Sequence, residues 1–157
     1  AHIGAFVICC YLGIAQVLSR RGTADDHLNH LILAATALAC GRAVEASTVS
    51  SNVMGWDHNL KMLTFTWPQV KTRKDKFVAM CAGSHRLICV FNAWGVTFAA
   101  GAFKTQQHTR DGMKFFFEDM AEKSSATAEI TRIIRSCASE VPELSEECTG
   151  GSLREGA

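Results

Sequence analysis

KFVAMCAGSHRLICVFNAWGVTFAAGAFK, residues 76–104, combines length with an almost complete lack of charge, and it decides how the rest of the chain is interpreted. Between its terminal lysines lie twenty-seven residues, of which only Arg86 carries a formal charge. Residues 87–103 form an uncharged run close to the length that a helix needs to cross a bilayer. The stretch therefore predicts a transmembrane helix over about residues 79–103.

Small residues recur inside the same stretch, at Gly95, Ala99, Ala100 and Gly101. Each glycine inside a water-exposed helix costs about 1 kcal/mol relative to alanine. In a membrane, small residues instead allow neighbouring helices to approach closely. The spacing therefore favours close contact with another helix over the stability of the helix itself.

A second long uncharged segment occupies residues 1–19. Its apolar side chains are distributed all round a helical wheel, so a helix here offers no face suited to water. Arg20 and Arg21 follow at once, as expected on the positively charged side of a membrane. The sequence predicts a second transmembrane span over residues 1–19.

A helix start is predicted at Thr23, because Asp25 and Asp26 suit the positive end of a helix dipole. The apolar run behind it, residues 27–41, is short for a membrane span and more typical of a buried core helix or an interfacial segment. A crossing by residues 27–46 would also place the basic residues on opposite sides of the membrane, against the usual bias. Two spans are therefore preferred, and residues 27–46 are kept as an alternative third span.

The remaining segments are more polar. One short extended piece is expected at residues 63–67, where apolar and polar residues alternate until Pro68. Residues 110–138 show the spacing of an amphipathic helix, and residues 142–157 read as an acidic flexible tail. The predicted fold is all-α: a small helical integral-membrane protein with two or three transmembrane helices, an amphipathic C-terminal helix and a single domain over residues 1–141.

The composition argues against several functional classes. The net charge is +1, which gives no basic field for nucleic acid. Seven cysteines without a CxxC pair indicate buried thiols rather than a disulfide framework or a zinc module. No nucleophile motif or phosphate-binding loop is present, so we expect no enzymatic activity.

Two histidines are candidate ligands of a cofactor. His85 lies in the third apolar segment and His30 in the second, where an imidazole is a strong axial ligand for haem or chlorophyll. The alternative is that His85 and Arg86 hydrogen-bond to neighbouring protein or face lipid headgroups. No metal site is predicted at Cys81, His85 and Cys89, because eight residues of helix span about 12 Å.

These features predict a non-catalytic structural or assembly subunit of a larger membrane complex, with other membrane subunits and lipids as partners. An organellar photosynthetic or respiratory complex, in the thylakoid or the mitochondrial inner membrane, is the expected setting. The chain begins at Ala1 rather than methionine, which is compatible with a removed leader. The alternative is a soluble all-helical protein–protein interaction domain in which residues 1–19 and 87–103 form buried central helices.

Overall fold

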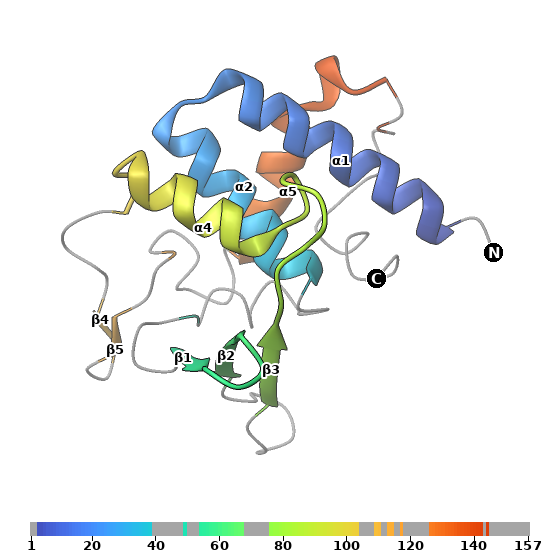
Figure 1. Ribbon diagram of the computed structural model, residues 1–157. Helices are drawn as coiled ribbons and strands as arrows, with labels where there is room; N and C mark the ends of the chain where they lie inside the picture. Colours follow the sequence, from blue (N-terminus) through green and yellow to red (C-terminus); the bar gives the residue numbers. More distant parts are fainter. Residues whose placement is uncertain are drawn as a thin grey trace.

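The computed structural model describes residues 3–38, 49, 54–67, 76–103, 109–110, 113–114, 117, 126–142 and 144. Within these ranges, a group of α-helices lies beside a three-stranded antiparallel sheet (Figure 1). The helices are α1 (Ile3–Arg21), α2 (Ala24–Leu38), α4 (Val90–Ala99), α5 (Ala126–Ser136) and the short 3-10 helix η3 (Ala138–Glu140). The strands are β1 (Met54–Asp57), β2 (Met62–Trp67) and β3 (Lys76–Met80), with β4 (Thr109–Arg110) and β5 (Met113–Lys114) as a separate pair.

The prediction of a transmembrane helix over residues 79–103 is wrong, because this segment contains three different structures. Its first residues end β3, residues 81–89 form a connection, and α4 then runs for only ten residues. Ten helical residues extend about 15 Å, half the thickness of a bilayer core. The segment is only partly buried: Met80, Val90, Ala93, Trp94 and Thr97 lie in the core, whereas residues 81–86 and one side of α4 are exposed.

The all-α membrane fold is also contradicted as a whole. Among the residues that the structure describes, no helix is long and apolar enough to cross a membrane. The expected location in a thylakoid or mitochondrial inner membrane is contradicted by the same finding. The all-helical alternative is wrong too, since three strands form a sheet.

The predicted segment 1–19 is helical from Ile3 onward, but α1 is packed within the protein. Its described part buries Tyr11, Ile14, Ala15, Val17 and Leu18. Apolar burial of this kind contributes roughly 25 cal/mol per Å² removed from water, whether the cover is protein or lipid. The apolar helix was predicted correctly, but it is covered by protein where lipid was predicted.

The α1–α2 hairpin is closed by a glycine and a helix cap. Gly22 adopts a positive φ of 67° and donates its N–H to the Leu18 carbonyl at 3.1 Å, which ends α1. Thr23 Oγ1 then accepts the Asp26 N–H at 3.1 Å and donates to Asp26 Oδ2 at 2.6 Å. The helix start predicted at Thr23 is confirmed, and residues 31–36 of α2 are buried as expected of a core helix.

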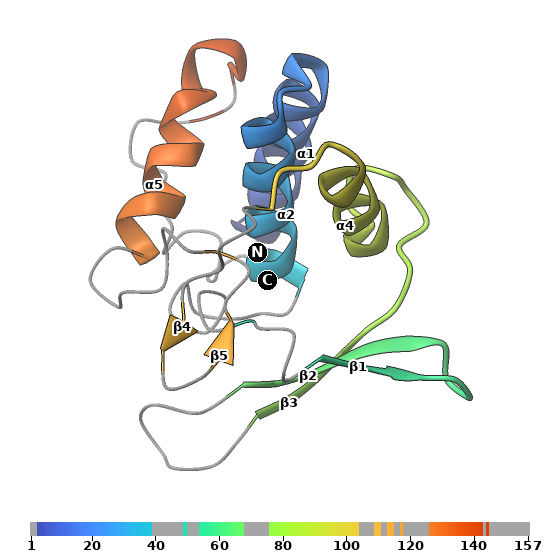
Figure 2. The ribbon, with the colours of Figure 1, turned by 90° about the vertical axis from the view of Figure 1, so that its left-hand side faces the viewer.

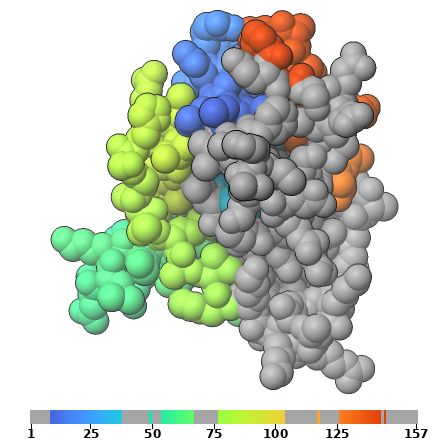
Figure 3. Space-filling view, turned by 90° about the vertical axis from the view of Figure 1, so that its right-hand side faces the viewer, coloured from blue at the N-terminus to red at the C-terminus, as the bar shows by residue number. Residues whose placement is uncertain are grey.

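The sheet lies beyond one end of the helices (Figure 2). Phe65 pairs with Val78 and Leu63 with Met80, so these alternate residues point to the same side, and Phe65, Val78 and Met80 are buried. The predicted extended piece at residues 63–67 lies in β2, which ends before Pro68. The β1–β2 hairpin protrudes from the surface (Figure 3).

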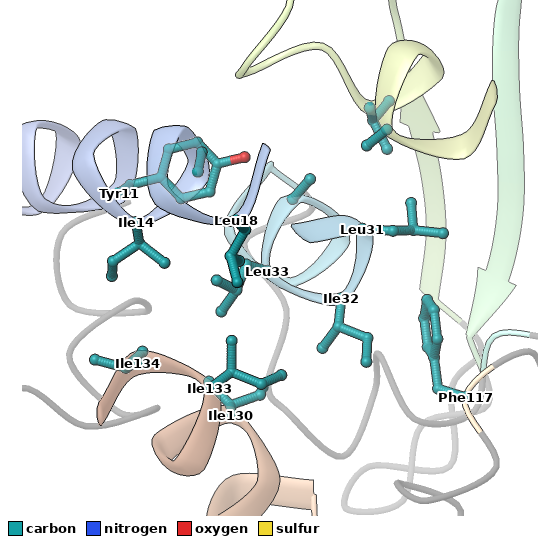
Figure 4. Close-up of a cluster of buried hydrophobic side chains, with 14 of the residues drawn as sticks. Tyr11, Ile14, Leu18, Leu31, Ile32, Leu33, Phe117, Ile130, Ile133 and Ile134 are labelled. Atoms are coloured by element: carbon teal, nitrogen blue, oxygen red, sulfur yellow. The ribbon is translucent and has the colours of Figure 1, made fainter. Parts of the chain in front are cut away.

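The core is completed by α5, whose isoleucines meet the α1–α2 hairpin (Figure 4). Ile130, Ile133 and Ile134 are buried, and in Figure 4 they point toward the side chains of α1 and α2. The amphipathic helix is shorter than the predicted residues 110–138, because β4 and β5 occupy part of that range and α5 begins only at Ala126. Of the predicted acidic tail, only Pro142 and Leu144 belong to the described residues.

Ion pairs join the end of α1 to η3, which follows α5. Arg20 and Arg21 both bind the Glu140 carboxylate, and Arg21 also donates to the Ser136 carbonyl at 2.9 Å. The hydrogen bond from Arg21, together with that from Arg20, lowers the pKa of Glu140. The two arginines predicted to flank a membrane therefore hold two helices together.

We predict that Gly22→Ala lowers the free energy of unfolding by about 1 kcal/mol, because an L side chain is strained at this positive φ. Urea denaturation followed by circular dichroism measures the change.

The matched control is Gly95→Ala in α4. A Cβ at Gly95 has no heavy atom within 4 Å, so the helix propensity of alanine is expected to raise the free energy of unfolding by up to about 1 kcal/mol. A loss of stability in this control, or none in Gly22→Ala, contradicts the analysis.

Candidate functional site

The connection between β3 and α4, residues 81–89, contains two cysteines, a serine, a histidine and an arginine within nine residues. We call it the 81–89 loop. It descends along the side of the molecule from α4 to the sheet (Figure 2). Its exposed members include Cys81, Ser84, His85 and Arg86, and Cys89 at its end is half-buried.

The loop is anchored by one backbone carbonyl. The Leu87 oxygen accepts the Tyr11 hydroxyl of α1 at 3.1 Å and lies 2.9 Å from His30 Nε2 of α2. Burial raises the pKa of Tyr11, so its hydroxyl stays a donor at neutral pH. Two buried polar side chains are satisfied by the same acceptor, which fixes the loop across the α1–α2 hairpin.

Further hydrogen bonds shape the loop itself. The Leu87 N–H donates to His85 Nδ1 at 3.2 Å, the Ile88 N–H donates to the His85 carbonyl at 3.0 Å, and Asn92 Nδ2 donates to the Arg86 carbonyl at 3.1 Å. Because His85 Nδ1 accepts, the neutral ring carries its proton on Nε2. The imidazole is thus exposed and oriented by the peptide that follows it.

The two predicted ligands, His85 and His30, both contact Leu87: His85 Nδ1 accepts its N–H, and His30 Nε2 lies against its carbonyl oxygen. His30 is 5% exposed, and its Nε2 is occupied by the bond to Leu87. Burial lowers the pKa of His30 by more than the hydrogen bond to Leu87 raises it, and His27 lowers it further. Within the described ranges, no group of three or more metal-binding side chains is found.

Cys89 occupies the N-cap position of α4, where an Asp, Ser or Thr side chain is usual. The thiol makes no capping hydrogen bond of regular geometry, but the N–H groups of Asn92, Gly83 and Phe91 lie close to it. Burial acts to raise the pKa of Cys89, and these three N–H groups outweigh it and lower the pKa. The thiol therefore loses its proton more readily than an ordinary cysteine.

Gly83 allows the loop to close on itself. A Cβ at this position would lie 3.1 Å from Cys89 Cα and 3.2 Å from the Ile88 carbonyl oxygen. Because both neighbours are backbone atoms, only glycine fits without moving the chain. This close approach brings the Gly83 N–H to the Cys89 thiol.

Comparison of the chain with protein-family models, with curated proteins and with solved structures gives no match. The candidate site is therefore defined by its own geometry: a loop fixed by Tyr11 and His30, with His85 and Arg86 outside and the Cys89 thiol at the start of α4.

His30 and His85 were predicted from the sequence as ligands of a cofactor, and that role stays a prediction. Tyr11 and the setting of Cys89 were not predicted. Tyr11 is the one tyrosine of an otherwise apolar helix, so its hydroxyl needs a partner. For Cys89, the sequence offers one indication of the unusual setting: the helix that follows it has no polar residue at the N-cap position.

We predict that Tyr11→Phe lowers the free energy of unfolding by about 1 kcal/mol, because one hydrogen bond to the Leu87 carbonyl is lost. Urea denaturation measures the effect. Gln16→Ala, an exposed change on the same helix, serves as the control and is expected to alter stability by only a few tenths of a kcal/mol. Equal stability of Tyr11→Phe and wild type would contradict the anchoring role.

We predict that iodoacetamide alkylates Cys89 at neutral pH faster than it does in a Gly83→Ala variant, by severalfold. The thiolate is the reactive form, and displacing the Gly83 N–H raises the thiol pKa. Peptide mass spectrometry follows each cysteine separately across pH 6 to 9. Cys137 is the internal control, because burial raises its pKa and it should stay unreactive in the folded protein. Equal rates at Cys89 in the two proteins refute this account.

Proposed function

We propose that this chain is a non-catalytic structural subunit that binds another protein through the outer face of α4. One observation carries the proposal: α4 contains no charged residue, although Asn92, Gly95, Phe98 and Ala99 on its outer side are exposed. Surface helices normally place charged or polar residues toward water. An exposed apolar surface of this kind is typical of a binding site for protein.

The outer face is separate from the face that holds α4 in the fold. Val90, Ala93, Trp94 and Thr97 are buried, and Thr97 Oγ1 donates to the His27 carbonyl of α2 at 3.0 Å. The exposed residues occur at helical spacing on the opposite side. One side of α4 is therefore fully used in the core, and the other is available to a partner.

Phe98 is the central residue of this surface. It is 58% exposed, yet its ring stacks on Trp94 at 5.8 Å and contacts Phe103 at 4.6 Å, measured between ring centroids. A ring that is already held in place loses little conformational entropy on binding. Held aromatic side chains are the residues that most often dominate protein interfaces.

The β1–β2 hairpin extends the apolar surface beyond α4. Trp56, 46% exposed, lies with its ring centroid 5.8 Å from that of Phe91 at the beginning of α4, and Leu60 at the hairpin turn is also exposed. The protruding hairpin in Figure 3 thus adds an aromatic residue beside the same helix. Together, α4 and the hairpin supply exposed aromatic side chains and a wider apolar surface for an interface.

We predict that Gly95→Lys removes the chain from its native assembly without unfolding it. A lysine here places a charge and a long side chain at the centre of the outer face, while its Cβ meets no atom of the protein. The measurement is native gel electrophoresis of the tagged chain from its own cells. Wild type should migrate with a partner, and Gly95→Lys as the free chain.

Two further variants define the surface. Phe98→Glu is expected to weaken binding by about thirtyfold, from the loss of about 2 kcal/mol of apolar burial. Thr127→Glu, exposed on α5, adds a charge on a different helix and should leave the assembly intact. The proposal fails if wild type itself migrates as the free chain, or if Gly95→Lys and Phe98→Glu remain in the assembly.

A further inference from the structure

The outer face of α4 is symmetrical in position about Gly95, which lies at the middle of the helix. Asn92 and Phe98 lie three residues to either side of it, and Phe91 and Ala99 lie four residues to either side. All five residues are at least partly exposed, and residues three and four apart share one face of a helix. The face therefore presents the same positions when the helix is viewed from either end.

The side chains at these positions complement one another under a twofold rotation. In an antiparallel pair of α4 helices centred on Gly95, Phe91 of each copy lies opposite the small Ala99 of the other. In the same way, the exposed Phe98 lies opposite the shorter Asn92. Gly95 meets only itself, and because it has no side chain the two helix axes can approach to about 8 Å.

We propose that the outer face of α4 binds a second copy of this chain, with the two α4 helices antiparallel and crossing at Gly95. The inference rests on the proposed function, because it names the protein that this face binds. Closed twofold dimers are the commonest soluble oligomers, and they require a self-complementary surface of this kind.

The charges beside α4 favour the antiparallel arrangement. Its first turn contains no acidic residue and its last turn no basic one, so neither end of the helix dipole is compensated within the helix. The exposed Arg86 precedes the helix by four residues. At the other end, Thr97 Oγ1 donates to the His27 carbonyl, which brings the start of α2 and the exposed Asp25 beside the last turn of α4. Within the described ranges neither Arg86 nor Asp25 forms an ion pair, and antiparallel helices place Arg86 of each copy toward Asp25 of the other.

The β1–β2 hairpin supplies the area that α4 lacks. A stable dimer buries about 800 Å² per partner, whereas the ten residues of α4 extend only about 15 Å. The hairpin protrudes on the same side as α4, away from α5 (Figure 2), and Trp56 contacts Phe91 at the beginning of α4. In the antiparallel dimer, the hairpin of one copy therefore lies beside the C-terminal half of the other copy's α4, where Phe98 is exposed. Trp56 and Leu60, which are 46% and 66% exposed in the single chain, are then covered.

Sedimentation equilibrium of the purified full chain tests the inference. Wild type is expected to have twice the mass of one chain. Gly95→Lys should sediment as a monomer, because it places two positive charges at the twofold axis, and the matched control Thr127→Glu should remain a dimer. Circular dichroism verifies that each variant is folded. A wild type that is monomeric at every concentration that stays in solution, or a dimeric Gly95→Lys, overturns the inference.

The outcome separates this inference from the proposed function. If purified wild type is monomeric but the assembly in its own cells still requires Gly95 and Phe98, the face binds a different protein and only the inference fails. If the assembly is insensitive to both changes as well, the proposed function fails with it.

Charge reversal tests the antiparallel arrangement. Arg86→Glu and Asp25→Arg each place two pairs of like charges across the dimer and should weaken self-association by about tenfold. An equal mixture of the two variants restores opposite charges at both contacts, so a mixed dimer should form with nearly wild-type affinity. A mixture that associates no better than its components overturns the proposal.

A cross-link covers the case in which Asp25→Arg does not fold. Gly95→Cys places a thiol of each copy at the twofold axis, so mild oxidation with diamide should link two copies through position 95, as mapped by peptide mass spectrometry. Thr127→Cys, exposed on α5, should stay unlinked under the same conditions. No link at position 95, or an equal yield at position 127, overturns the proposal.

Discussion

The structure depends on a single acceptor, the carbonyl oxygen of Leu87. Two helices with largely apolar buried faces each contribute one polar group, the Tyr11 hydroxyl and the His30 imidazole, and both are satisfied there. A buried donor left without a partner costs about 1 to 3 kcal/mol. The loop that carries Leu87 is consequently a required part of the core, and its position determines where α4 begins and which face α4 shows to solvent.

This arrangement explains why an uncharged sequence does not imply a membrane. The same low charge at residues 87–103 results from a half-buried loop end, a helix packed on α2 and an outer face without charge. Hydrophobic composition reports removal from water and does not distinguish lipid from protein. Only the break at Gly83 and Ser84, and the short alternating strand before it, indicated that the segment was composite.

The parts that could be predicted were local ones. Thr23 with Asp26 marks a helix start because a cap involves neighbours in sequence, and the alternation over residues 63–67 marks β2 for the same reason. Strand β3 could not be recognised alone, since its pairing with β2 requires a partner outside the segment. At the site, both histidines stood out as polar groups in apolar runs. Their shared contact with Leu87 depends on the fold and has no signature in sequence.

The bond between Tyr11 and Leu87 also joins residues 76 positions apart. A ribosome adds roughly 5 to 20 residues per second, so about 4 to 15 seconds separate the synthesis of Tyr11 from that of its acceptor. During that interval the 81–89 loop is not available to cover the α1–α2 hairpin. The speed of translation across the intervening segment therefore sets how long the Tyr11 hydroxyl and the His30 imidazole remain without the acceptor that they share.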